Sequence, residues 1–145
     1  MSDIILSKDV YENVCIKKHD GTILSSFSFN PSDANITDRF EEFAAGMEEL
    51  EIIISEYEKE KDYKKTKEML KKINEAIYQK VNGLLNEDVA KDIFKVMGPL
   101  SPLPSGDYYF TFIVEQIGIK IQNATGQRVK KIEMKVKKHT KKYHG

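Results

Sequence analysis

The spacing of apolar residues changes abruptly within residues 27–43. Phe27 and Phe29 stand two positions apart, which is the repeat of a β-strand with one buried face. After Pro31 the apolar residues stand four and three positions apart, which is the repeat of an amphipathic helix. Pro31 offers no backbone N–H to a sheet and so marks the end of the strand. The pattern predicts a strand that leads directly into a long helix.

Residues 10–29 have the alternation and the turn chemistry of a β-hairpin. Val14 and Ile16 alternate with polar neighbours, and Asp20-Gly21 supplies the backbone freedom that a tight turn needs. On the second arm, one side carries Ile23, Phe27 and Phe29. Residues 3–6 are a candidate third strand. Because a two-stranded hairpin is marginally stable alone, its phenylalanine side should rest on a helix.

The start of the helix can be placed in two ways. Asn30 is a good N-cap, with Pro31 at the first helical position and Asp33 near the positive helix end. Alternatively, residues 30–33 form a short turn and Asp33 caps the helix proper. The helix then continues to about residue 60.

Two apolar stripes with helical spacing predict an antiparallel helical hairpin. The highly charged residues 58–68 between them are either the polar tip of this hairpin or part of one continuous solvated helix, and we expect the former, with the bend near residues 58–64. The first stripe is Ile36, Phe40, Phe43, Met47, Leu50, Ile54 and Tyr57, and the second is Leu70, Ile73, Ile77, Val81 and Leu84.

Two further helices follow. The first spans residues 88–97, is capped by Asn86 or Asp88, and faces inward with Val89, Ile93 and Phe94. Asn82-Gly83 would ordinarily favour a turn, but the apolar spacing continues through it, so we expect only fraying there. The proline-rich residues 98–106 are expected to form a loop, and the second helix spans about 107–123.

The segment at the start of the last helix is apolar on all sides. Tyr108, Phe110 and Phe112 cannot all face one core, so this segment is either central to the core or partly covered by another chain. For Phe40 and Phe43 ordinary core packing is the favoured interpretation.

The expected fold class is α+β and mainly α, with the hairpin packed on a bundle of about four helices. A chain of 145 residues has the size of one domain, which we place at 1–127, with the hairpin at about 10–29 and the bundle at about 31–123. We expect residues 128–145 to form a basic tail that is partly disordered. For the part just after Gly126, the apolar spacing is compatible with either a helix or a strand.

Charge is distributed unevenly along a chain whose net charge is +0. The tail has one acid, Glu133, against eight bases: Arg128, Lys130, Lys131, Lys135, Lys137, Lys138, Lys141 and Lys142. It therefore carries +7, which leaves −7 on residues 1–127. Such a tail could hold phosphates, but only Tyr143 could stack on bases and the acidic body would repel nucleic acid. Contact with an acidic protein surface, including that of a second copy, explains the tail as well.

The sequence carries no sign of catalytic or metal chemistry. Cys15, the only cysteine, is expected to be half-buried on a strand, and the histidines His19, His139 and His144 lack partners at metal-ligand spacing. No phosphate-binding loop, dinucleotide fingerprint or nucleophile elbow occurs. We expect a non-enzyme with no catalytic residues, metal or cofactor. The start of the chain does not resemble a signal peptide and no apolar run could cross a membrane, which predicts a cytoplasmic protein.

Across residues 27–145 the order of elements resembles a known family. The segments FNPSDANITDRFEEF, GLLNEDVAKDIFKVMGPLSPL and the ending KKHTKKYHG resemble the small tail assembly chaperones of long-tailed phages and prophages of Gram-positive bacteria. The resemblance implies an assembly factor, absent from the virion, that coats the apolar helical tape measure protein and can recruit tail tube subunits. In many members a ribosomal frameshift gives a second, longer form.

The requirements of such a chaperone match several features of the chain. Adaptable methionine and aromatic side chains provide contact area, and a charged helical hairpin keeps a complex in solution. The residues that we expect to contact a partner are Met97, Leu100, Leu103, Tyr108, Tyr109, Phe110, Phe112 and Ile113. Homo-oligomerisation is a further expectation. The alternatives are a minor structural or connector protein of a phage tail, and a nucleic-acid adaptor that uses the basic tail.

Overall fold

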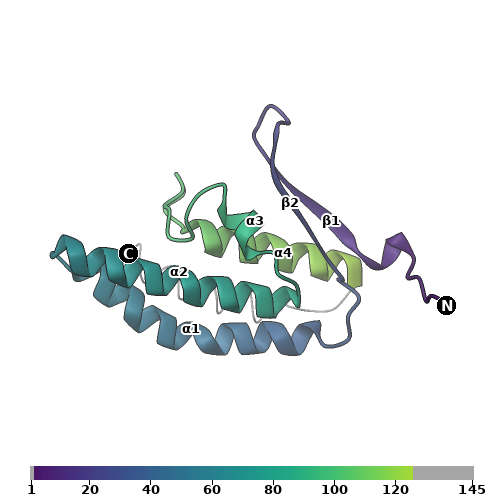
Figure 1. Cartoon of the computed structure of the whole chain (residues 1–145), viewed down its shortest axis with the longest axis horizontal. Helices are drawn as coiled ribbons and strands as arrows, with labels where there is room; N and C mark the ends of the chain where they lie inside the picture. Colours follow the sequence, from purple (N-terminus) through teal and green to yellow (C-terminus); the bar gives the residue numbers. More distant parts are fainter. Residues whose placement is uncertain (1, 126–145) are drawn as a thin grey trace.

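The computed structural model describes residues 2–125, which form a hairpin and four helices in the predicted order (Figure 1). A single 3-10 turn, Lys8–Val10, precedes the hairpin. The strands are β1 (Glu12–Lys17) and β2 (Ile23–Phe29), and the helices are α1 (Ile36–Lys59), α2 (Tyr63–Leu85), α3 (Ala90–Phe94) and α4 (Tyr109–Thr125). The predicted α+β, mainly α, fold class is confirmed.

The hairpin has one buried face and one exposed face. Val14 pairs with Phe27 and Glu12 with Phe29, so the buried phenylalanines and the half-buried Val14 lie on the same side. At the turn, Gly21 has a φ of +92°, which glycine adopts without strain, and the Thr22 N–H donates to the Asp20 carboxylate at 2.9 Å. The predicted tight turn is therefore present.

The two ends of the hairpin region differ from the sequence prediction. Residues 3–6 form no third strand, since the described sheet has two strands and Ile4 and Ile5 are exposed. The prediction that Ile23 shares the side of the phenylalanines is wrong, because the strand register shifts between Ile16 and Lys17 and pairs Ile23 with Lys17 of the exposed face. Ile23 is accordingly exposed, at the tip of a hairpin that projects away from the helices (Figure 1). Cys15 is exposed as well, since it lies on the outer face of β1.

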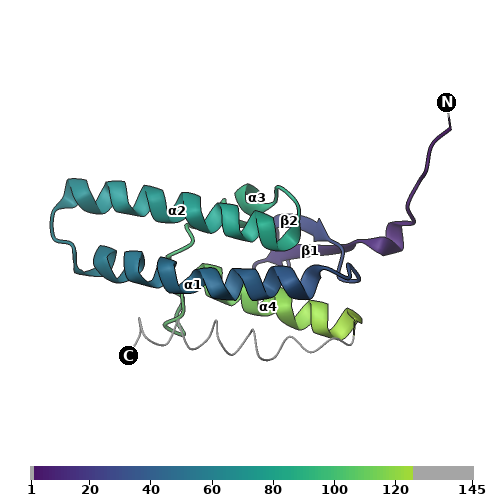
Figure 2. The ribbon, with the colours of Figure 1, turned by 90° about the horizontal axis from the view of Figure 1, so that it is seen from below.

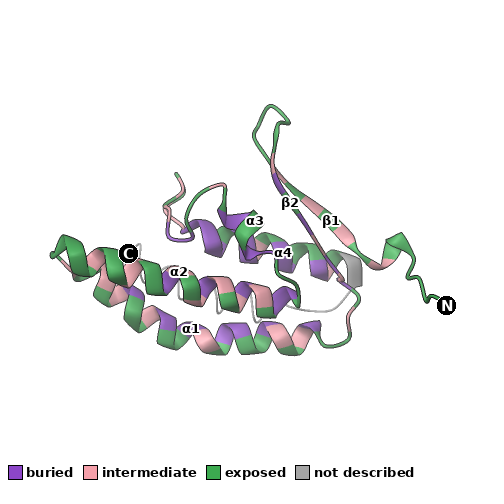
Figure 3. Cartoon of the chain, viewed as in Figure 1, coloured by how far each residue is buried: buried purple, intermediate pink, exposed green. Residues whose placement is uncertain are grey.

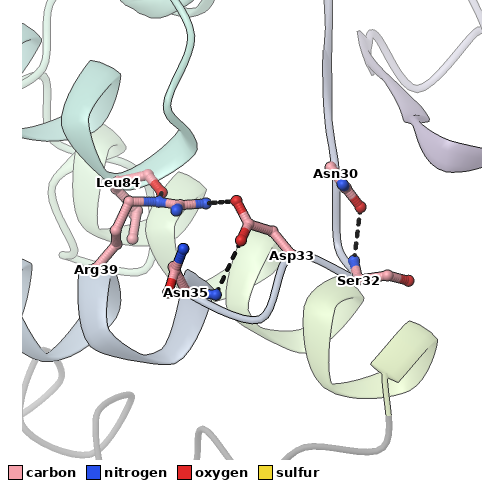
Figure 4. A network of polar contacts seen from close by, with 6 residues as sticks. All are labelled: Asn30, Ser32, Asp33, Asn35, Arg39 and Leu84. Atoms are coloured by element: carbon pink, nitrogen blue, oxygen red, sulfur yellow. Dashed lines mark hydrogen bonds and ion pairs between the residues drawn. The ribbon is translucent and has the colours of Figure 1, made fainter. Parts of the chain in front are cut away.

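Two side-chain turns join β2 to α1 (Figure 4). The side-chain oxygen of Asn30 accepts from the Ser32 N–H, and that of Asp33 accepts from the Asn35 N–H, both at 2.9 Å. The helix therefore begins at Ile36, with Asn35 as its N-cap residue, so placing the N-cap at Asn30 was wrong. The alternative prediction is correct in placing a short turn ahead of the helix, but wrong in making Asp33 the N-cap, since Asp33 lies two residues before Asn35.

The two long helices form the predicted antiparallel hairpin, with its bend at residues 60–62. All members of the first stripe up to Ile54 are buried, and Tyr57 is half-buried. Asp62 caps α2, because its carboxylate accepts from the N–H groups of Lys64 and Lys65. Helix α4 lies against this pair, antiparallel to α1, so the three helices form one bundle (Figure 2).

Helix α2 continues through Asn82-Gly83 and ends at Leu85, so the sequence position that suggested fraying is helical. Asn86 closes the helix in the left-handed conformation, with a φ of 54°. The side-chain oxygen of Asn82 then accepts from the N–H groups of Val89 and Ala90, at 2.9 and 2.8 Å. This side chain, rather than Asn86 or Asp88, supplies the cap of α3.

Helix α3 is shorter than predicted, but its inward face is as expected. Val89, Ile93 and Phe94 are all buried in a core that α1, α2, α4 and the hairpin share (Figure 3). The hydroxyl of the buried Ser25 donates to the carbonyl oxygen of Asp92, which links β2 to α3. The hairpin is thus held against the helices by both apolar and polar contacts.

Candidate functional site

The predicted contact residues lie around the junction of the 95–108 loop and α4. The loop folds back on the first turn of the helix, where the N–H groups would otherwise lack partners. The Tyr109 N–H donates to the Ser101 carbonyl oxygen at 2.9 Å, and the Phe110 N–H donates to the Pro99 carbonyl oxygen at 3.0 Å. Backbone carbonyl groups therefore take the place of a side-chain cap.

Tyr109 is a core residue and not a surface contact. It is 3% exposed, and its ring meets the Phe94 ring edge to face with 5.8 Å between centroids. Its hydroxyl donates to the Ile93 carbonyl oxygen at 2.9 Å. Burial raises the pKa of Tyr109 to about 12, so the hydroxyl keeps its proton and stays a donor at neutral pH.

The neighbouring aromatic residues are also mostly internal. Tyr108 and Phe110 are buried, their rings lie 6.3 Å apart, and the Tyr108 hydroxyl donates to the Glu58 carboxylate near the end of α1. Ile113 and Leu100 are buried too, and Leu103 is partly buried against the core. Except for the partly buried Leu103, these residues are therefore not accessible to a partner in this conformation of the chain.

Two of the predicted residues remain at the surface. Phe112 is 40% exposed and Met97 is 36% exposed. The structure adds Ile119, which is 41% exposed and lies seven residues after Phe112. Since seven residues make almost two full helical turns, Phe112 and Ile119 lie on the same side of α4. We call these two residues the α4 outer pair.

The seven-residue spacing of the α4 outer pair is visible in the sequence, but it could not be singled out there. Phe110, Ile113 and Ile117 give an equally good helical stripe, and this is the stripe that the fold buries. Which stripe faces the core depends on how the loop positions the first turn of α4.

Residues 2–125 were also compared with the geometry of a metal site and of a membrane-spanning helix. No group of three or more histidine, cysteine, aspartate or glutamate side chains is close enough there to hold a metal ion. No helix in the same residues is long and apolar enough to cross a membrane. The eight basic residues of the tail lie outside the described residues.

Comparison of the chain with protein-family models, with curated proteins and with solved structures finds no match.

Proposed function

We propose that this protein is a phage tail assembly chaperone that binds the tape measure protein and keeps it in solution while the tail assembles. The proposed role is binding without a chemical step. Tail tube subunits are a second proposed partner. The protein would act in the cytoplasm of the host bacterium and be absent from the mature virion.

The observation that carries this proposal is the exposure of the α4 outer pair. Phe112 and Ile119 keep about two fifths of their surface in water, although Phe110 and Ile117 of the same helix are fully buried. Large apolar side chains two turns apart form the kind of face that an apolar helix can lie against. A tape measure protein is a long apolar helix that needs such cover before the tube forms around it.

A second part of the surface supports the same proposal. The N-terminal arm exposes three consecutive aliphatic residues, Ile4, Ile5 and Leu6, at 97, 86 and 59%. Consecutive exposed aliphatic residues are unusual on a protein surface that has no partner. The arm extends away from the bundle, so it could reach a client without disturbing the core (Figure 2).

The charge of the long helices fits a role in solubility. The outer side of α1 exposes carboxylates at Glu41, Glu48, Glu49 and Glu56. A bound apolar helix covered on one side by such subunits would present charge to water on the other side. An apolar client has no such charged surface of its own.

Co-expression with the tape measure protein tests the proposal. That client is expected to be the very long helical protein encoded downstream of this gene, with a tube protein encoded upstream. Expressed alone the client should precipitate, and expressed with this chain it should be recovered in solution as a complex with several copies of the chaperone. An insoluble client, together with empty pull-downs of both client and tube protein, would contradict the proposal.

Mass spectrometry of purified virions separates this proposal from a role as a tail component. A chaperone should be absent from mature particles, whereas a minor tail or connector protein should be present in a fixed number of copies.

A further inference from the structure

Strand β1 has an outer edge that pairs with no other strand of residues 2–125. The described sheet has two strands, so β1 uses one edge for β2 and leaves the other free. A free edge presents unpaired backbone N–H and C=O groups, which proteins commonly protect with charged residues or proline. Residues 13–16, at the centre of β1, include neither. The edge is therefore a template for a further strand.

The N-terminal arm, residues 3–6, has the side chains of a strand but lies outside the sheet. Ile4 and Ile5 are 97 and 86% exposed, and β-branched residues favour an extended chain. The 3-10 turn Lys8–Val10, capped by the Ser7 side chain, separates the arm from β1. Because the arm leaves this turn in the direction away from the sheet, it does not reach the edge of its own β1 (Figure 2).

One antiparallel register matches the apolar side of the arm to the apolar side of β1. It places Ile4 opposite Ile16 and Leu6 opposite Val14. Val14 and Ile16 are partly buried and pack against the core, so the two arm residues would extend the same apolar face. A shift of two residues in either direction keeps the faces but places Ile4 or Leu6 opposite a charged residue.

The polar side of the same register is matched as well. Asp3 would lie opposite Lys17, so opposite charges meet at the end of the paired segment. Ile5 would lie opposite Cys15, which is exposed on the outer face of β1. A parallel arrangement would keep the apolar pairs but place Asp3 opposite the uncharged Asn13, so the charges favour the antiparallel one.

We propose that the arm of one copy pairs with the free edge of β1 in a second copy, as the third, antiparallel strand of that sheet. Backbone hydrogen bonds of this kind give affinity, and the alternating side chains set the register. A second copy is the favoured occupant because every copy carries both the arm and the edge, whereas the client proposed above is helical and offers no strand. This inference goes beyond the proposed function and does not depend on it. Ile5 stays on the outer face of the sheet, so the client contact proposed for the arm remains open.

Disulfide trapping tests the contact in the full chain. Ile5→Cys places a thiol opposite the native Cys15, within the distance that a disulfide spans, so mild oxidation should join two copies covalently on a non-reducing gel. Leu6→Cys is the matched control, because residue 6 lies on the other face of the strand and its thiol should not reach Cys15. The double variant Ile5→Cys/Cys15→Ser should also remain uncrosslinked. An absent disulfide, a disulfide within one copy, or equal crosslinking of Ile5→Cys and Leu6→Cys would overturn the proposal.

Light scattering measures the same contact without a disulfide. The wild type should have a larger mass in solution than one chain. Ile4→Asp/Leu6→Asp should have the mass of one chain and an unchanged circular dichroism spectrum, because the arm lies outside the core. Ile52→Asp, a change of an exposed aliphatic residue on α1, is the control and should keep the larger mass.

A wild type with the mass of one chain, or a larger mass that survives Ile4→Asp/Leu6→Asp, would overturn the proposal. An assembly of wild-type chains that fails to capture the client would support this inference and contradict the proposed function alone.

Discussion

At the scale of single residues, polar side chains close the joints between the secondary structure elements. The side-chain oxygen of Asn82 accepts hydrogen bonds from two N–H groups at the start of α3, and the hydroxyl of Ser25 donates to the carbonyl oxygen of Asp92. Arg39 bonds both the Asp33 carboxylate, at 2.9 Å, and the carbonyl oxygen of Leu84 near the end of α2, at 3.0 Å (Figure 4). These bonds connect α2 and β2 to α3, and the start of α1 to the end of α2.

Replacing Asn82 tests the first of these joints. Asn82→Ala leaves the N–H groups of Val89 and Ala90 without their partner, and should lower the free energy of unfolding by about 1–2 kcal/mol. Urea denaturation followed by circular dichroism measures the change. Gln79→Ala, an exposed change on the same helix, should stay within about 0.5 kcal/mol of the wild type. Equal stability of the two variants would exclude the capping role.

The joint at Asp33 should depend on pH. The Asn35 N–H, and after it the Arg39 guanidinium, hold the pKa of the Asp33 carboxyl below its ordinary value of 3.8. A lowered pKa means that the folded state favours the carboxylate, so this stabilisation is complete above pH 3.8 and is lost as the pH falls through the folded-state pKa.

Asp33→Asn isolates the charge, because the amide oxygen can still accept from the Asn35 N–H. At pH 7 the variant should be less stable than the wild type, by less than about 1 kcal/mol, since the ion pair lies near the surface. The difference should vanish in strong acid. A difference that stays constant from neutral to acid pH would show that the charge of Asp33 is not its source.

At the scale of elements, helix α2 shows how packing overrides a local turn signal. Asn82-Gly83 is typical of a turn, but Val81, Leu84 and Leu85 are buried in the core and hold this turn of the helix in place. The left-handed residue that ends the helix comes three positions after Gly83, at Asn86. Gly83 therefore has an ordinary helical conformation, in which glycine is a poor choice.

Two glycine substitutions should thus have opposite effects. A Cβ atom added at Gly83 or at Gly21 meets no other atom within 4 Å. Gly83→Ala should raise the free energy of unfolding by about 0.5–1 kcal/mol, because alanine is the better helix former. Gly21→Ala should lower it by about 1 kcal/mol, because its φ of +92° disfavours any side chain. Thermal denaturation of both variants measures the two changes in the free energy of unfolding. Changes of the same sign in the two variants would contradict this explanation.

At the scale of the whole molecule, one apolar core joins the hairpin and the helices, and the α4 outer pair lies outside it. Phe110 and Phe112 illustrate the division. Phe110→Ala should lower the free energy of unfolding by about 3–5 kcal/mol, whereas Phe112→Ala should change it by less than about 1 kcal/mol. Urea denaturation checks both values, and a large loss at Phe112 would place that ring in the core.

Much of this architecture could be predicted from the sequence, because the apolar stripes on α1 and α2 have unambiguous helical spacing. The hairpin followed from Asp20-Gly21 and from the alternation around it. The first residue of α1 was uncertain, since Asn30, Asp33 and Asn35 all have capping side chains and only the path of the chain selects among them. The cap at Asn82 joins residues of two different elements, which local patterns do not reveal.

The candidate site was harder to predict for a related reason. Apolar residues surround the first two turns of α4, so spacing alone could not tell that Phe110 is buried and Phe112 is exposed.

The central claim is that the α4 outer pair contacts the client, and one comparison tests it most directly. Capture of the co-expressed tape measure protein is measured for the wild type and for the double variant Phe112→Asp/Ile119→Asp. Tyr63→Glu, a change of another exposed ring at the start of α2, serves as the control, since an acid is favourable at the start of a helix. We predict a folded double variant that recovers almost no soluble client, and a control that recovers as much as the wild type. Full recovery of the client by a folded double variant would contradict the account.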